Sequence, residues 1–166
     1  MNARAKLAVT KRDLGHHKEA EGLEVQVLDQ RIQILGELHP DTMQARANLA
    51  VTKQDLGHLK EAEALKVEVL NQRMQILGEL HPDTVWARAS LAVTKNALGH
   101  LKEAEALEVE VLNQRMQILG ELHPDTVRAR ANLAATRHTL EHSRHAVEPS
   151  GSLSPQGGSS GKTTND

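Results

Sequence analysis

Apolar residues recur along this chain at steps of three and four, and the whole arrangement returns after 42 residues. After His58 the apolar positions are Leu59, Ala62, Leu65, Val69, Leu70, Met74 and Leu77. This is the period of an amphipathic helix that buries one face, so we predict a helix of about 20 residues here. Gly78 follows it, and glycine supplies the left-handed conformation with which many helices end.

A shorter helix is predicted before it, from about Pro40 to Leu56, and Gly57 separates the two. Pro40 lacks the backbone donor that the first helical turn leaves unpaired, and the carboxylate of Asp41 complements the helix dipole there. The two helices form a hairpin. Neither helix hides its apolar face alone, so the hairpins must stack on one another.

A repeated stretch, GELHPDT, joins one hairpin to the next at 36–42, 78–84 and 120–126. Residues 43–84 and 85–126 are identical at 36 of 42 positions. A fixed period of this length is typical of stacked helical hairpins. The predicted fold is therefore all-α: a right-handed α-solenoid of antiparallel helical hairpins, with about 3.5 repeats and seven helices.

The repeat array is expected to span residues 1–146. Its units lie at about 1–38, 39–80 and 81–122, followed by a partial unit at 123–146. Glu141 stands where a fourth turn glycine belongs, and the pattern decays after it. Residues 147–166 are rich in Ser, Gly and Pro and offer too little apolar surface for a core, so we predict a disordered tail.

Composition narrows the classes of function. The chain has no cysteine, which excludes disulfides, thiolate metal sites and cysteine nucleophiles. A formal net charge of −2 argues against a nucleic-acid partner, which calls for a basic surface. No apolar run approaches the ~18 residues of a membrane span. We expect a cytoplasmic protein without a cofactor and without a nucleic-acid or membrane partner.

The pattern NLAxxxxxLGxxxEAExLxxxVLxxRxxxLGExHPDT, read from Asn48 to Thr84, resembles the tetratricopeptide repeat in its 42-residue, kinesin-light-chain-like form. Similar arrays accompany NB-ARC-type signalling ATPases of fungi and bacteria. One departure concerns the fourth position after the leucine of the Leu-Ala pair. The family usually has Tyr or another large residue there, and this chain has Lys11, Lys53, Lys95 and Arg137.

The resemblance implies that the first helix of each repeat lines a concave groove that binds a peptide. An asparagine before the Leu-Ala pair would hold the peptide backbone. Asn48 and Asn132 match this asparagine, while Lys6 and Ser90 occupy its place in the other repeats. The neighbouring groove positions are Gln44, Trp86, Arg128, Val51, Val93, Gln54, Asn96 and His138.

Six positions distinguish the two near-identical repeats, and five of them lie on the first helix. They are Met43/Val85, Gln44/Trp86, Asn48/Ser90, Gln54/Asn96, Asp55/Ala97 and, on the second helix, Lys66/Glu108. A surface that diversifies for recognition gives this distribution. Drift at positions without a packing role gives it as well.

The distribution of charge also favours the groove lined by the first helices as the recognition surface. The first helices carry a net charge of +6 and the second helices −4, so a groove lined by first helices favours acidic peptides. The alternative is two solvated faces held by local pairs, such as Glu61 with Lys60 and Lys66. Trp86, the only Trp, Tyr or Phe, is either a binding hot spot or cover for a gap between repeats.

Two sets of histidines are candidate ligands or bases. One histidine precedes proline in each turn and is predicted to form hydrogen bonds at a helix entry: His39, His81 and His123. Three others share one helical face and are weak candidates for a transition-metal site: His138, His142 and His145. We predict no metal site.

No arrangement of nucleophile and base stands out from the repeating background, so an enzyme is not expected. We predict a non-catalytic module that binds a peptide or partner protein. The positive charge of the groove favours an acidic peptide. The alternative is a structural role, in which uncapped ends stack on another copy or join a larger signalling or motor-adaptor assembly.

Overall fold

A computed structural model describes the backbone of residues 3–147 and the side chains of residues 3–143. Within this range the chain forms seven helices and no strand. They are α1 (Ala3–Asp13), α2 (His17–Leu35), α3 (Pro40–Asp55), α4 (Leu59–Leu77), α5 (Pro82–Ala97), α6 (Leu101–Leu119) and α7 (Pro124–Val147). None of these described helices is long and apolar enough to cross a membrane.

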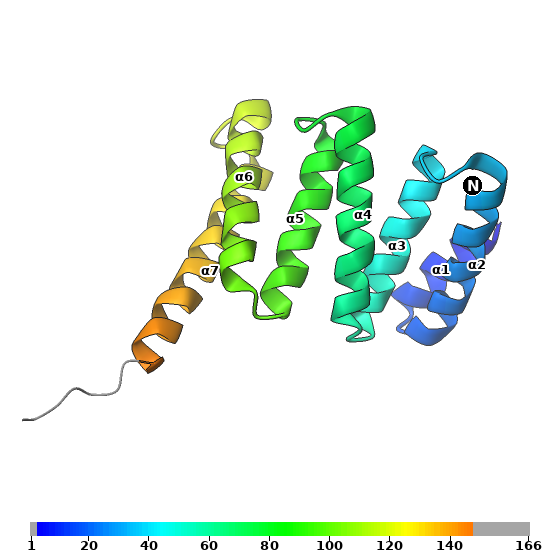
Figure 1. Ribbon diagram of the computed structural model, residues 1–166, viewed down its shortest axis with the longest axis horizontal. Coiled ribbons are helices and arrows are strands. Elements are labelled where there is room, and N and C mark those ends of the chain that lie inside the picture. The colour runs from blue at the N-terminus through cyan, green and yellow to red at the C-terminus, as the bar shows by residue number, and fades with distance from the viewer. Residues whose placement is uncertain (1–2, 148–166) are drawn as a thin grey trace, which may run out of the picture.

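The helices form a row of antiparallel hairpins along the long axis of the molecule (Figure 1). Each helix packs against the helices before and after it in sequence. Small clusters of buried aliphatic residues join each hairpin to the next, as Val69 and Leu70 of α4 join Ala87 and Leu91 of α5. The predicted all-α solenoid is confirmed.

The turns lie where the sequence places them. Gly57 and Gly78 have φ of 80° and 84°, the left-handed region that favours glycine. His39 Nδ1 accepts a hydrogen bond from the backbone N–H of Asp41 at 3.1 Å, which satisfies one of the free donors at the start of α3. His81 and His123 do the same for α5 and α7, so their predicted role at helix entries is confirmed.

Lys53 and Lys95, which stand where the family usually has a large residue, form ion pairs that connect neighbouring hairpins. Lys53 Nζ lies 2.5 Å from Glu21 Oε1 of α2 and 2.6 Å from Glu61 Oε2 of α4. Lys95 repeats this arrangement with Glu63 and Glu103. Glu61 therefore pairs across helices with Lys53, and the predicted local pair with Lys66 is wrong because Lys66 is buried elsewhere.

The last described helix differs from its predecessors. α7 has 24 residues, whereas α3 and α5 have 16 each. Glu141 replaces the turn glycine, so the helix continues where α3 and α5 end. The predicted partial unit at 123–146 is thus one helix. Of the predicted tail, Val147 is the last residue of α7, and 148–166 lie outside the described residues.

Candidate functional site

A concavity of about 420 Å³, which we call the central groove, lies at the middle of the row. Residues of α3, α5 and α7 line it, together with one cation each from α4 and α6. The lining residues are Val51, Gln54, Lys66, Trp86, Ala89, Ser90, Val93, Arg115, Arg128 and Asn132. Seven of the predicted site residues thus come together here: Val51, Gln54, Trp86, Ser90, Val93, Arg128 and Asn132.

Lys66 is the most buried of the three cations, with only 6% of its surface exposed. Its Nζ donates to Gln54 Oε1 at 2.5 Å, to the backbone oxygen of Ser90 at 3.2 Å and to Thr94 Oγ1 at 2.7 Å. These acceptors are all neutral. Burial lowers the pKa of Lys66 from 10.5 to about 8, against a smaller opposing effect from Asp55.

Arg115 and Arg128 extend the positive charge toward α7. Arg115 Nη1 donates to the backbone oxygen of Asp125 at 3.0 Å, and Arg128 Nη2 donates to the Asp125 carboxylate at 2.5 Å. Burial lowers the pKa of Arg115, yet a guanidinium keeps its charge in proteins. Both arginines also line a neighbouring hollow of about 250 Å³, which contains Asp83 and Asp125.

Trp86 lies between these two hollows and lines both. The residue is 47% exposed, so part of its side chain contacts the protein and part is available to solvent. The guanidinium carbon of Arg73 lies 5.8 Å from the ring centroid, within the range of a cation–π interaction. The ring therefore has both a packing contact and a free surface.

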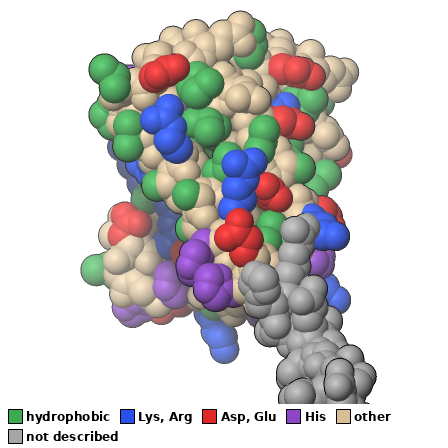
Figure 2. Space-filling model, turned by 90° about the vertical axis from the view of Figure 1, so that its left-hand side faces the viewer, with side chains coloured by type: hydrophobic (Ala, Val, Ile, Leu, Met, Phe, Trp, Pro, Cys, Tyr) green, Lys and Arg blue, Asp and Glu red, His purple; other side chains and the backbone are tan. Residues whose placement is uncertain are grey.

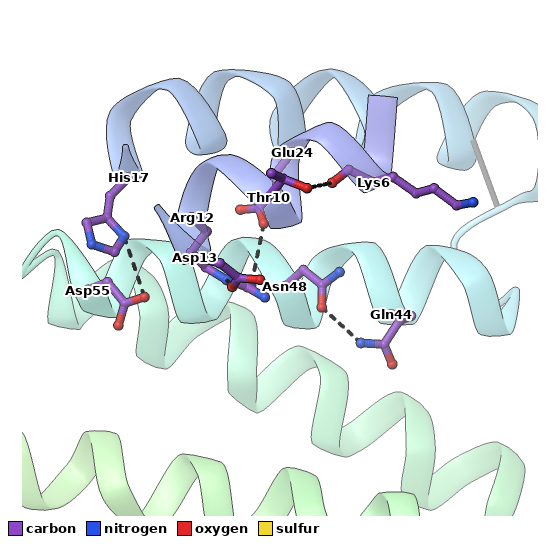
Figure 3. A network of polar contacts seen from close by, with 9 residues as sticks. All are labelled: Lys6, Thr10, Arg12, Asp13, His17, Glu24, Gln44, Asn48 and Asp55. Carbon is purple, nitrogen blue, oxygen red and sulfur yellow. Dashed lines mark hydrogen bonds and ion pairs between the residues drawn. The ribbon is translucent and has the colours of Figure 1, made fainter. Parts of the chain in front are cut away.

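Three predicted site residues lie elsewhere. Gln44 Nε2 donates to Asn48 Oδ1 at 3.0 Å, one turn along α3, and Figure 3 shows this pair beside α1. Lys6 is exposed on α1. Asn48 lines a small separate hollow with Ala5 and Glu24. Gln44 Oε1 also accepts from Arg73 Nη2 of α4 at 3.3 Å. None of the three lines the central groove.

Asn96 belongs to a set of contacts between hairpins that we call the polar bridges. In each bridge a buried charge on an even-numbered helix lies between the odd-numbered helices on either side. The bridges are Arg12–Glu24–Thr52, Gln54–Lys66–Thr94 and Asn96–Glu108–Thr136. Only the middle one is hydrogen-bonded through its charge. In the first, Arg12 Nη1 lies 3.5 Å from Glu24 Oε1, and in the third Asn96 Nδ2 donates to Thr136 Oγ1 at 2.6 Å beside Glu108. Both oxygens of Glu24 and Oε2 of Glu108 are buried without a hydrogen bond. Figure 3 shows Arg12 and Glu24 of the first bridge. The central charge alternates as Glu, Lys and Glu.

The two glutamates of the bridges carry a burial cost. Burial raises the pKa of Glu108, and the side chains of Thr136 and Asn96, which face its carboxylate, act against this rise. Burial raises the pKa of Glu24 in the same way, opposed by Thr52 and Arg12. These carboxylates are thus easier to protonate than exposed ones.

The structure divides the six differences between the two similar repeats by environment. Met43 and Val85 are both buried in the core. Gln54/Asn96 and Lys66/Glu108 are neighbouring positions within one bridge. Trp86 and Ser90 face the central groove. The cations Lys66 and Arg115 were missed because they lie on second helices, although the difference at 66/108 marked one of them.

The weak metal candidates do not form a described ligand set. The rings of His138 and His142 lie 4.1 Å apart, and His142 Nδ1 is 2.8 Å from the backbone oxygen of His138. The side chain of His145 lies outside the described residues. Among the described side chains, no group of three or more His, Cys, Asp or Glu is placed to hold a metal ion.

Antiparallel hairpins stacked with a 42-residue period define the class of helical repeat solenoids. The family model for the tetratricopeptide repeat matches residues 1–41, 42–83 and 84–125. The chain therefore belongs to the tetratricopeptide repeat family, in its kinesin-light-chain-like form. Repeats of this family generally mediate protein–protein interactions.

Solved structures share the fold. A Podospora anserina protein assigned as a kinesin light chain, with nearly identical TPR-like repeats, has a TM-score of 0.78 and 26% identity over 87% of this chain and 69% of that one. A point variant of the same protein gives a TM-score of 0.78 and 25% identity over 87% and 68% of the two chains. BtubC (BKLC) from P. vanneervenii has a TM-score of 0.75 and 16% identity over 98% and 70%, which shows a shared fold alone. A comparison with curated protein sequences finds no match.

Proposed function

We propose that this protein binds an acidic segment of a partner protein in the central groove. The observation that carries the proposal is the charge of the groove. Three cations line it, Lys66, Arg115 and Arg128, and none of its ten lining residues is acidic. Arg128 is exposed and so can pair with a carboxylate of the partner, while the buried cations Lys66 and Arg115 add positive charge nearby.

The remaining lining suits an extended peptide. Asn132 offers an amide that both donates to and accepts from a peptide backbone. Val51, Val93 and the exposed part of Trp86 offer apolar contact for side chains of the partner.

An array of acidic and basic peptides tests the preference. We expect acidic peptides to bind, with an affinity that falls as salt rises because the contacts are electrostatic. Arg128→Glu should weaken binding about tenfold or more, whereas Arg130→Glu, the same change two residues away on α7 but outside the groove, should leave it unchanged. Equal binding of acidic and basic peptides would refute the proposal.

Trp86→Ala separates recognition from packing. Because the residue is half-exposed, we expect a small loss of stability, about 1 kcal/mol or less, together with a loss of peptide binding. A large drop in melting temperature would mean that the ring mainly fills the junction between hairpins. Binding that persists in a folded Trp86→Ala variant would exclude the ring from recognition.

Binding should also depend on pH above neutrality. The pKa of Lys66 is lowered to about 8, so its ammonium group loses its proton as pH rises through that value. Affinity for an acidic peptide should therefore decrease between about pH 7 and pH 9. In Lys66→Met this decrease should disappear.

A further inference from the structure

The outer side of α7 repeats a helix surface that is covered elsewhere in the molecule. We define the α7 end face as Val127, Arg130, Ala134 and Arg137, which follow at steps of three and four and so share one side of the helix. One repeat earlier the same positions are Val85, Arg88, Ala92 and Lys95. Figure 2 looks onto the α6 and α7 end of the molecule, where basic, acidic and apolar side chains lie side by side.

In the preceding hairpin, α6 covers this surface with specific contacts. Arg88 Nη1 donates to Gln114 Oε1 at 2.5 Å, and Arg88 Nε lies 2.9 Å from Glu110 Oε2. Lys95 Nζ lies 2.5 Å from Glu103 Oε2. Between these pairs, the small residues Ala92 and Ala104 are almost completely buried. The covering helix thus presents two glutamates seven residues apart, with an alanine directly after the first.

The hairpin of α3 and α4 uses the same contacts. Arg46 pairs with Gln72 at 2.8 Å and with Glu68 at 3.2 Å. Lys53 pairs with Glu61, seven residues before Glu68. The surface and its covering helix are therefore matched twice within one molecule, by charge and by side-chain size.

On α7 these contacts are missing within the described part of the chain. Val127 is 49% exposed, whereas Val85 is 3% exposed. Arg130 and Ala134 are exposed, and no described residue pairs with Arg130. Arg137 keeps only the partner that belongs to the preceding hairpin, Glu105 of α6 at 2.7 Å. Because Glu141 replaces the turn glycine, α7 continues and does not fold back to cover its own surface.

We propose that the α7 end face docks an acidic amphipathic helix of a partner protein. That helix would run antiparallel to α7, with a carboxylate beside Arg137, a second carboxylate seven residues later beside Arg130, and a small residue against Ala134. A second copy of this chain does not offer such a helix, because the matching glutamates of α4 and α6 are engaged with their own hairpins. The site is separate from the central groove and does not depend on it.

A labelled helical peptide tests the proposal on the full chain. The probe has the sequence of residues 101–119, LKEAEALEVEVLNQRMQIL, stapled across the positions of Asn113 and Gln117, which are exposed in α6. We expect saturable binding by fluorescence anisotropy. Binding should weaken about tenfold or more for the double variant Arg130→Glu with Arg137→Glu. A probe with Glu103→Arg and Glu110→Arg should recover binding to that variant to within about threefold of the original pair.

The control is Lys60→Glu, at an exposed position of α4 outside both the α7 end face and the central groove, which should leave probe binding unchanged. Equal binding of the two probes to the unmodified chain, or no saturable binding, would overturn the proposal. So would a loss of binding caused by Lys60→Glu and not by the α7 end face variant. If the unmodified chain alone dimerises, and the Arg130→Glu variant does not, a second copy takes this face and the proposal is also wrong.

Discussion

The same side chains stand on α5 and on α7, yet they lie in different surroundings. Arg88 is buried beside Gln114 and Glu110, while Arg130, one repeat later, is exposed. Ala92 is buried against α6, while Ala134 is exposed. The difference comes from the neighbour and not from the residue, because α6 folds back over α5 and no described helix folds back over α7. Matched substitutions at the two places measure what one covering helix contributes.

The largest expected difference is at the alanines. Ala92→Leu should lower the free energy of unfolding by about 3 kcal/mol, because a larger side chain has no room between α5 and α6. Ala134→Leu should change it by less than about 0.5 kcal/mol, since that position is exposed. Urea denaturation of both variants measures the two effects. Equal losses would mean that α7 is covered like α5.

The second difference is at the arginines. Arg88→Ala should cost about 2 kcal/mol, because it removes a charged hydrogen bond and a close ion pair from a buried position. Arg130→Ala should cost less than about 0.5 kcal/mol. Thermal unfolding monitored by circular dichroism compares them. If the two variants unfold at the same temperature, the contacts of Arg88 with α6 contribute nothing net.

The smallest expected effect is in the Glu108 bridge, whose central charge is opposite to that of the Lys66 bridge. Glu108→Gln should stabilise the protein by about 1 kcal/mol at pH 7, because the amide keeps the polar contacts and removes the cost of a buried carboxylate. The pKa of Glu108 is higher in the folded protein than in the unfolded chain. The cost of the buried carboxylate is therefore fully present above the pKa of the folded state and is absent below the pKa of the unfolded state. The gain should therefore disappear near pH 4.

Exposed Glu121, which has no described partner, supplies the control for Glu108→Gln. Glu121→Gln should leave the unfolding free energy unchanged at both pH values. A loss of stability in Glu108→Gln at pH 7 would show that the carboxylate is worth more to Asn96 and Thr136 than its burial costs.

Much of the fold could be predicted because each local signal agrees with the others. The glycines, His-Pro-Asp entries and three-and-four spacing placed α3 and α4 to within about two residues of their observed bounds. The extension of α7 to Val147 was harder to see. The loss of one glycine at Glu141 marked it, but the distance over which a helix continues depends on residues without a strong stop signal.

The central groove could be predicted only in part. The register of the first helices identified Trp86, Ser90 and Asn132, because residues at the same position of a repeat share one face. It did not identify Lys66 and Arg115, which reach the groove from second helices. Nor did it show that Gln54 and Asn96 contact the buried charges of the bridges, since that contact joins positions twelve residues apart on different helices.

Trp86 offers a direct test of partner binding because it is the only tryptophan in a chain without Tyr or Phe, and it lines the central groove. Its emission therefore reports occupation of the groove. On titration with an acidic peptide we predict a saturable change in Trp86 emission that is absent in Arg128→Glu and absent with a peptide in which Gln replaces every Glu. Saturable binding of the acidic peptide with no change in Trp86 emission, or an equal response to the neutral peptide, would contradict acidic-segment recognition in the groove.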